Sequence, residues 1–124
     1  MALQRYTEEI LVTLKSEGIF KEGKRLYWSV VVVEPGAKAQ GNHRDKVGDT
    51  DYWTVFIPMT KWPNQGTTLF PGGTEGSVDK PYYFHGDVEH RGGANRSNKT
   101  RIVLCCVVCN EPDRNRRMHY PFVG

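Results

Sequence analysis

This sequence of 124 residues contains no long apolar run. A membrane-spanning helix needs roughly 18 or more successive apolar residues, and no segment approaches that length. Residues 1–14 carry Arg5, Glu8 and Glu9 among their apolar side chains, so they lack the continuous apolar stretch of a secretory signal. We therefore expect a cytoplasmic protein without a membrane partner.

Cysteine is also scarce: the three cysteines, Cys105, Cys106 and Cys109, are close together in the chain. An odd, clustered set does not suit a disulfide framework. Neighbouring side chains in a strand point to opposite faces, so Cys105 and Cys106 do not converge on one metal ion. We expect free thiols buried as small apolar side chains, with Cys105 and Cys109 on the same face as Arg101.

Charge of one sign does not dominate, because 17 basic and 14 acidic residues leave a net charge of +3. The basic excess lies toward the C-terminus, where Arg114, Arg116 and Arg117 belong to an expected basic tail at 111–124. Such a tail can bind nucleic acid or an anionic substrate. No nucleic-acid fold signature accompanies it, so we interpret it as solvated and do not expect nucleic acid as a partner.

The remaining composition is that of a globular protein, with 38% hydrophobic and 25% charged residues. A chain of this length can bury one core without metal or disulfide support. We expect a single domain over residues 1–124.

The chain pattern predicts one helix followed by short strands. Leu3, Tyr6, Ile10 and Leu14 recur at helical spacing, which predicts a helix over about 3–17 that ends before Gly18. Strand-like runs separated by turn residues follow at Leu26–Val33, Tyr52–Met59, Thr67–Phe70, Tyr82–His85 and Arg101–Val108. This order favours a mainly β antiparallel sandwich or barrel over a parallel α/β sheet, with its core at about 24–110. Because Leu26–Val33 is apolar on both faces, we expect it to be a central strand.

Three residues have the types and spacing of a metal site. His43 and Asp45 are two positions apart, so both side chains project from one face of an extended segment. His90 lies in a second glycine-flanked segment and completes a facial set of two histidines and one carboxylate. That set suits Fe(II) and leaves coordination positions open. Arg101 is the first residue of the last predicted strand. Its guanidinium can bind a carboxylate near the metal through two parallel hydrogen bonds.

With these residues in place, the sequence resembles the Fe(II)/2-oxoglutarate-dependent dioxygenases, and among them the phytanoyl-CoA dioxygenase-like branch. The matching stretches are 35–45, 66–73, 86–97 and Arg101. The resemblance implies a double-stranded β-helix, or jelly roll, which in this chain follows the one predicted N-terminal helix. It also implies His43, Asp45 and His90 as catalytic iron ligands and Arg101 as the partner of the C5 carboxylate of 2-oxoglutarate. The prolyl-hydroxylase-like branch fits as well, and the substrate class does not carry over because the usual additional helices are missing.

We therefore expect a non-haem iron oxygenase that couples 2-oxoglutarate decarboxylation to oxidation, such as hydroxylation, of a small-molecule or peptide substrate. Two alternatives stay open. One is a cupin-like metal-binding protein that does not use 2-oxoglutarate, and the other is a non-catalytic jelly-roll binding module. His85 and His119 are interpreted as structural or surface residues.

One helix can cover only part of a multi-stranded sheet. An uncovered apolar face is rarely left in water by a monomer, so we expect a homodimer.

Overall fold

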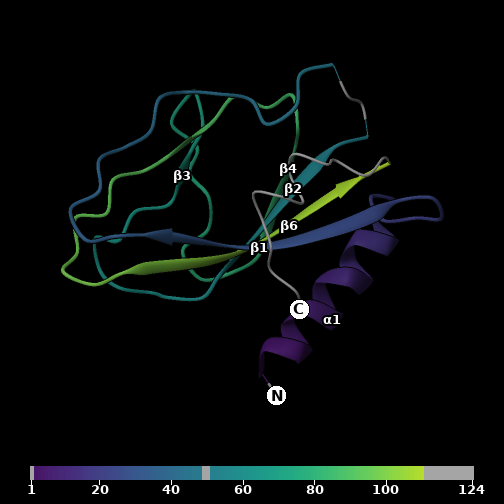
Figure 1. Ribbon diagram of the computed structural model, residues 1–124, viewed down its shortest axis with the longest axis horizontal. Helices are drawn as coiled ribbons and strands as arrows, with labels where there is room; N and C mark the ends of the chain where they lie inside the picture. Colours follow the sequence, from purple (N-terminus) through teal and green to yellow (C-terminus); the bar gives the residue numbers. More distant parts are fainter. Residues whose placement is uncertain (1, 49–50, 111–124) are drawn as a thin grey trace.

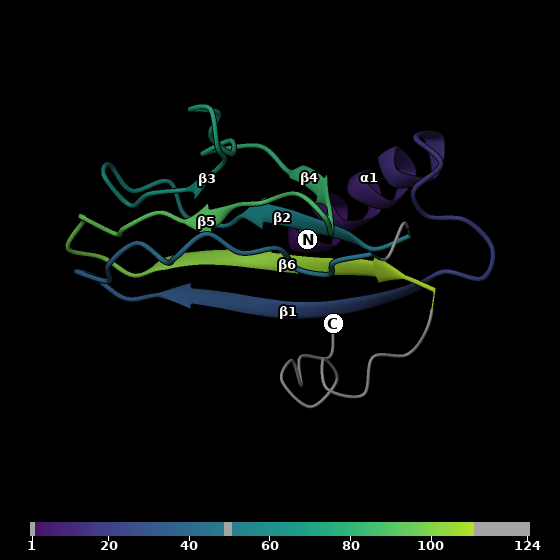
Figure 2. The same ribbon diagram turned by 90° about the horizontal axis from the view of Figure 1, so that it is seen from above.

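Two antiparallel sheets form the body of the protein in the computed structural model, which describes residues 2–48 and 51–110. The larger sheet has the strand order β1, β6, β2, β4, which Figure 2 shows edge-on. Its members are β1 (Arg25–Val33), β6 (Arg101–Cys109), β2 (Trp53–Pro58) and β4 (Tyr82–His85). The smaller sheet pairs β3 (Thr68–Leu69) with β5 (Arg91–Gly92).

Two isolated bridges extend the smaller sheet and reveal the topology. His43 pairs with His90 beside β5, and Glu75 pairs with Leu69 of β3. The extended segments in chain order are therefore β1, the His43 segment, β2, β3, the Glu75 segment, β4, β5 and β6. If these segments are numbered 1 to 8 in that order, the larger sheet consists of segments 1, 8, 3 and 6. The smaller sheet consists of segments 2, 7, 4 and 5. This alternation is the winding of a jelly roll, so the expected mainly β jelly roll with one N-terminal helix is confirmed.

Helix α1 (Ala2–Ser16) covers part of the outer face of the larger sheet (Figure 1). Ile10 and Leu14 are buried against this face. The helix ends at Ser16, and Gly18 follows it with a φ of 74°, the left-handed conformation that favours glycine. In the described part of the chain, no helix combines the length and apolar character needed to cross a bilayer.

Strand β6 alternates between two apolar clusters, as its sequence predicts. Cys106 belongs to the cluster beneath α1, whereas Cys105 and Cys109 belong to the cluster on the inner face. All three cysteines are buried, and none of them forms a disulfide within the described residues. Burial raises the pKa of the Cys106 thiol, and Cys105 and Cys109 raise it further, so Cys106 is held in its neutral form.

The expectation that Leu26–Val33 is central is wrong, because β1 lies at the edge of the larger sheet. Its inner face lines a cavity, and its outer face is covered only in part. Trp28 packs beneath the helix, whereas Val30 and Val32 are 44% and 55% exposed. An apolar pattern on both faces therefore reflects what covers the faces and not the number of neighbouring strands.

The other expected elements agree with the structure apart from their ends. The second and third strand runs are shorter than predicted, since only Trp53–Pro58 and Thr68–Leu69 form ladders. Strand β5 was not predicted because it contains two residues, one of them Gly92. The expected basic tail at 111–124 and His119 lie outside the described residues.

Candidate metal centre

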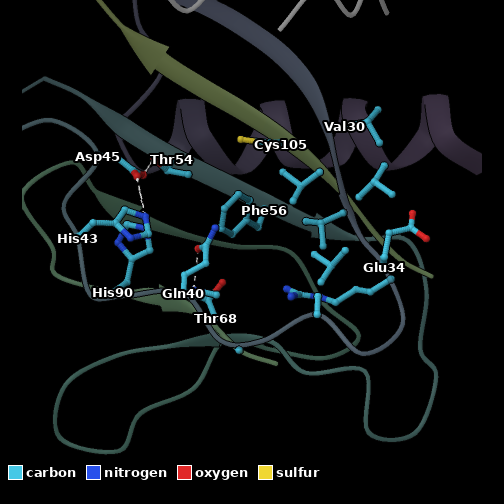
Figure 3. A pocket seen from close by; sticks show the side chains of 18 of the residues that line it. Val30, Glu34, Gln40, His43, Asp45, Thr54, Phe56, Thr68, His90 and Cys105 are labelled. Atoms are coloured by element: carbon cyan, nitrogen blue, oxygen red, sulfur yellow. Dashed lines mark hydrogen bonds and ion pairs between the residues drawn. The ribbon is translucent and has the colours of Figure 1, made fainter. Parts of the chain in front are cut away.

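The smaller sheet brings the three candidate ligands together. The backbone N–H of His43 donates to the carbonyl of His90 at 2.8 Å, and the N–H of His90 donates to the carbonyl of His43 at 2.9 Å. This pair joins two segments that are far apart in the sequence. Asp45 follows His43 closely enough to turn toward the same point (Figure 3).

The ligand atoms of His43, Asp45 and His90 all lie within 4.8 Å of one another. Asp45 Oδ1 is 3.3 Å from His90 Nε2 and 3.9 Å from His43 Nε2. Two imidazole nitrogens and one carboxylate oxygen that surround one point form a set that could hold a metal ion, so the structure brings together the residues that the sequence singled out.

Backbone carbonyls fix the orientation of both imidazole rings. His43 Nδ1 lies 3.0 Å from the carbonyl oxygen of Gly41, and His90 Nδ1 lies 2.9 Å from that of Val88. A carbonyl oxygen only accepts, so each Nδ1 carries the hydrogen. Each Nε2 is then available as a metal ligand.

Thr54 holds the carboxylate of Asp45. Its hydroxyl donates to Asp45 Oδ2, which turns Oδ1 toward the two histidines. Burial raises the pKa of Asp45, but its contacts with His90 and Thr54 and the nearby histidine charges more than offset this, so the pKa is lowered. For His90, burial lowers the pKa, and its contacts with Asp45 and the Val88 carbonyl outweigh that effect and raise it.

Aromatic rings pack against the imidazole ring of His90. The ring centroid of Phe84 is 4.5 Å from that of His90, and Phe70 packs at 5.3 Å against Phe84. His90 is 3% exposed, whereas the side chain of His43 is 43% exposed. The candidate site is therefore anchored on the buried His90 and open at His43.

A cavity of about 660 Å³ connects this candidate centre with Arg101. Side chains of the larger sheet line its wall, among them Phe56, Val103 and Cys105. Figure 3 shows the His43, Asp45 and His90 cluster at one end of the cavity and Val30 and Glu34 toward the other.

Arg101 is a buried cation in this cavity, with an exposed fraction of 5%. Within residues 2–48 and 51–110, no carboxylate forms an ion pair with its guanidinium. It contacts the hydroxyl of Tyr82, which in turn lies 2.6 Å from the hydroxyl of Thr68. Burial lowers the pKa of Arg101, and Tyr82 offsets part of that shift. The side chain remains charged because an arginine pKa begins so high.

Sequence reasoning did not identify Thr54, Tyr82 or Thr68. Their hydroxyls reach the site across sheet strands, and nothing in their local sequence distinguishes them from other strand residues. His85, interpreted as structural, is partly buried against the ring of Trp53, with 5.0 Å between centroids, and it lies outside the candidate centre.

No protein-family model matches this sequence, and no curated protein matches it. Among solved structures, EvdMO1 aligns with a TM-score of 0.55 and 17% identity over 71% of this chain. The aligned part is 28% of EvdMO1, so this chain spans less than a third of that protein. A cupin domain from Bordetella pertussis Tohama I aligns with a TM-score of 0.46 and 22% identity, covering 68% of this chain and 81% of that one. The similarity to EvdMO1 agrees with the jelly-roll fold.

Proposed function

We propose that this protein is a non-haem Fe(II) oxygenase that uses 2-oxoglutarate as cosubstrate. His43, Asp45 and His90 would hold the iron, and Arg101 would bind the C5 carboxylate. The observation that carries the proposal is the buried guanidinium of Arg101, which has no carboxylate partner in the described residues and lines the same cavity as the candidate ligands. An uncompensated buried charge is costly, so an anionic ligand is the partner that this site lacks.

The donor set fits ferrous iron. A ferrous ion held by His43, Asp45 and His90 would keep coordination positions for a 2-oxo acid and for dioxygen. The far carboxylate of a dicarboxylate bound there would have Arg101 as its partner in the same cavity. The planar guanidinium can bind that carboxylate through two parallel hydrogen bonds.

The balanced reaction converts 2-oxoglutarate, dioxygen and a substrate C–H group into succinate, carbon dioxide and a hydroxylated product. One oxygen atom enters succinate and the other enters the product. The chemistry that bound Fe(II) supplies is the activation of dioxygen, and the protein supplies binding, orientation and exclusion of water. Phe56, Val103 and Cys105 give part of the cavity wall an apolar surface, which would help to keep water from the reacting carbon.

The test measures 2-oxoglutarate binding and succinate release separately. Protein loaded with Mn(II) should bind 2-oxoglutarate in calorimetry, and protein loaded with Fe(II) should release succinate only with 2-oxoglutarate and oxygen present. The Asp45→Asn variant keeps the size of the side chain and should lose both signals with its metal. Metal binding without affinity for 2-oxoglutarate would contradict the proposal and favour a cupin-like metal-binding protein. Failure to bind either would favour a non-catalytic jelly-roll module.

A further inference from the structure

The open edge of strand β1 lies beside the cavity. β1 is the outermost strand of the larger sheet, and β6 is its one partner strand in the described part of the chain (Figure 2). The His43 segment is the edge of the smaller sheet on the side of β5. Both edges line the same cavity, and their exposed lining residues include Val30, Val32 and His43. The cavity therefore opens between the outermost strands of the two sheets.

The backbone of β1 is part of this opening. Four successive residues, Val30–Val33, line the cavity. Side chains alternate between the two faces of a strand, so successive residues all reach one cavity only where it borders the edge of the strand. A molecule at the cavity mouth therefore meets the backbone of β1 as well as its side chains.

The pairing of β6 shows which backbone groups of β1 are turned outward. The N–H of Met59 donates to the carbonyl of Ile102 at 3.0 Å, so the backbone of Ile102 faces away from β1. Bonding directions alternate along an antiparallel strand, so the backbone of Val103 faces β1 and bonds to Val31, its register partner. Pro58, which has no N–H, lies opposite Val103 on the other side, as this alternation requires.

The same alternation turns the N–H and C=O groups of Val30 and Val32 toward the open edge. Within residues 2–48 and 51–110, none of these groups has a backbone partner. The strand also lacks the usual features that block edge pairing. It contains no proline, its one charged residue is Arg25 at its start, and its register with β6 is continuous. The edge of β1 is therefore ready to pair with another extended backbone.

An extended peptide fits this edge better than a small molecule or a second copy of the chain. A row of alternating N–H and C=O groups matches the backbone of another strand. A strand paired here would direct every second side chain toward the inner face, where the cavity lies. A second copy held permanently at this edge would obstruct the opening through which a substrate must enter, whereas a peptide substrate leaves after reaction.

From this geometry we infer that the substrate of the proposed oxygenase is an extended peptide segment of another protein, bound as an additional strand on the open edge of β1. The inference rests on the proposed function. The peptide backbone would pair with Val30 and Val32, and a side chain on its inner face would carry the C–H group that is hydroxylated in the reaction balanced above. Apolar side chains on its outer face would pack beside these two valines. Backbone pairing would supply affinity, and the alternate side chains would supply selectivity.

The test uses a fluorescently labelled peptide with blocked ends, Lys-Val-Thr-Val-Thr-Val-Lys, and two N-methylated forms of it. Methylation of both threonine nitrogens blocks one edge of the peptide strand and leaves the other edge intact. Methylation of the central valine and the threonine after it blocks both edges with the same number of methyl groups. In fluorescence anisotropy with the Mn(II) protein, the first form should bind as well as the unmodified peptide. The second should bind about 10-fold or more weakly, because backbone hydrogen bonds are lost in every register.

A substitution in the protein tests the same contact from the other side. Val30→Pro removes an N–H that faces the open edge and is not used by β6, and such edge positions tolerate proline. Peptide affinity should fall about threefold or more, which is the size of one hydrogen bond. Affinity for Mn(II) should stay at the level of the unaltered protein, which shows that the fold is kept. Val78→Pro makes the same change at an exposed valine outside the cavity and should leave peptide affinity unchanged.

The outcomes separate this inference from the proposed function. If the Mn(II) protein does not bind 2-oxoglutarate, the proposed function fails, whatever the peptides show. If it binds 2-oxoglutarate and the unmodified peptide does not bind, the inference alone is overturned, and this result is expected if a second copy or another segment of this chain occupies the edge. Equal affinity for the unmodified peptide and both methylated forms would also overturn the inference, because binding would then not depend on backbone pairing.

Discussion

Each candidate ligand has a second polar contact that fixes its direction. The backbone carbonyls of Gly41 and Val88 orient the two imidazoles, and the hydroxyl of Thr54 orients Asp45. Such supporting contacts raise the metal affinity of a site because the ligands need less rearrangement. At the scale of single residues, the candidate centre therefore depends on Thr54 as well as on its three ligands.

Replacement of Thr54 by valine should weaken metal binding about 10-fold to 100-fold. Valine keeps the branched shape that suits strand β2 but does not donate to Asp45, so the carboxylate loses its fixed orientation. Titration of the protein with Mn(II), followed by electron paramagnetic resonance, measures the affinity. Thr68→Val makes the same chemical change in the same cavity without touching Asp45, and it should leave Mn(II) affinity unchanged. Equal affinities for Thr54→Val and the unaltered protein would remove Thr54 from this role.

Replacement of Arg101 by lysine should weaken 2-oxoglutarate binding about tenfold or more, because an ammonium group does not reproduce the two-pronged contact. Metal affinity should stay the same. Calorimetry with the Mn(II) protein measures both quantities, and Arg96→Lys, a change at an exposed arginine, serves as the matched control. Unchanged affinity for 2-oxoglutarate in Arg101→Lys would show that Arg101 does not bind the cosubstrate.

At the scale of elements, α1 stabilises the larger sheet from outside. Leu14 is fully buried in the cluster that also contains Val55 and Cys106, whereas Val12 on the other side of the helix is 67% exposed. Among residues 8–16 of the helix, none lines the cavity. We therefore expect the packing of this part of α1 to contribute to the free energy of unfolding.

Leu14→Ala should lower the free energy of unfolding by about 2–5 kcal/mol, through lost apolar burial and the cavity that remains. Val12→Ala removes a similar side chain from an exposed position and should change stability by no more than about 0.5 kcal/mol. Urea denaturation followed by tryptophan fluorescence measures both variants. A similar destabilisation by the two substitutions would contradict the packing of α1 described above.

The alternation within β6 could be predicted from the sequence because a strand has a period of two, and the faces of Cys105 and Cys106 follow once Arg101 is placed inside. The grouping of His43, Asp45 and His90 was likewise visible in residue types and spacing. The edge position of β1 could not be predicted, because its apolar pattern does not show which strands pair with it. The hydrogen bond from the Gly92 N–H to Gln40 Oε1 was also hidden, because it joins segments far apart in the sequence and depends on the missing side chain of Gly92.

At the scale of the whole molecule, the larger sheet keeps an apolar area that α1 does not cover. Val32 and Ile102 are register partners, and Met59 bonds through its backbone N–H to the carbonyl of Ile102. These residues and Val30 are between 37% and 55% exposed, and together they form the uncovered patch. Apolar patches of this kind favour association between copies of a chain.

We propose that the protein forms a homodimer through the uncovered patch, as two-fold pairing is the commonest form of self-association. Light scattering at micromolar concentration should give a mass above the 14.2 kDa of one chain. The variant Val32→Lys should shift the mass toward one chain, while Val12→Lys, an equal change on the exposed side of α1, should not. A mass of one chain that does not depend on protein concentration would exclude the dimer.

The pairing of β1 with β6 has a consequence for the order in which the molecule assembles. Arg25 pairs with Cys109, so the first strand of the described fold can join the larger sheet only when the last strand is present, because β6 is the strand that links β1 to β2 and β4. Closing so long a loop costs chain entropy before the new contacts repay it, which makes folding slow for such a topology. During synthesis on a ribosome, the cavity and its arginine cannot be in place until β6 has emerged. Ligand-binding competence is thus a late event in folding, and any nascent chain that stops short of β6 exposes β1 as an unpaired apolar strand, a target for chaperones and for aggregation.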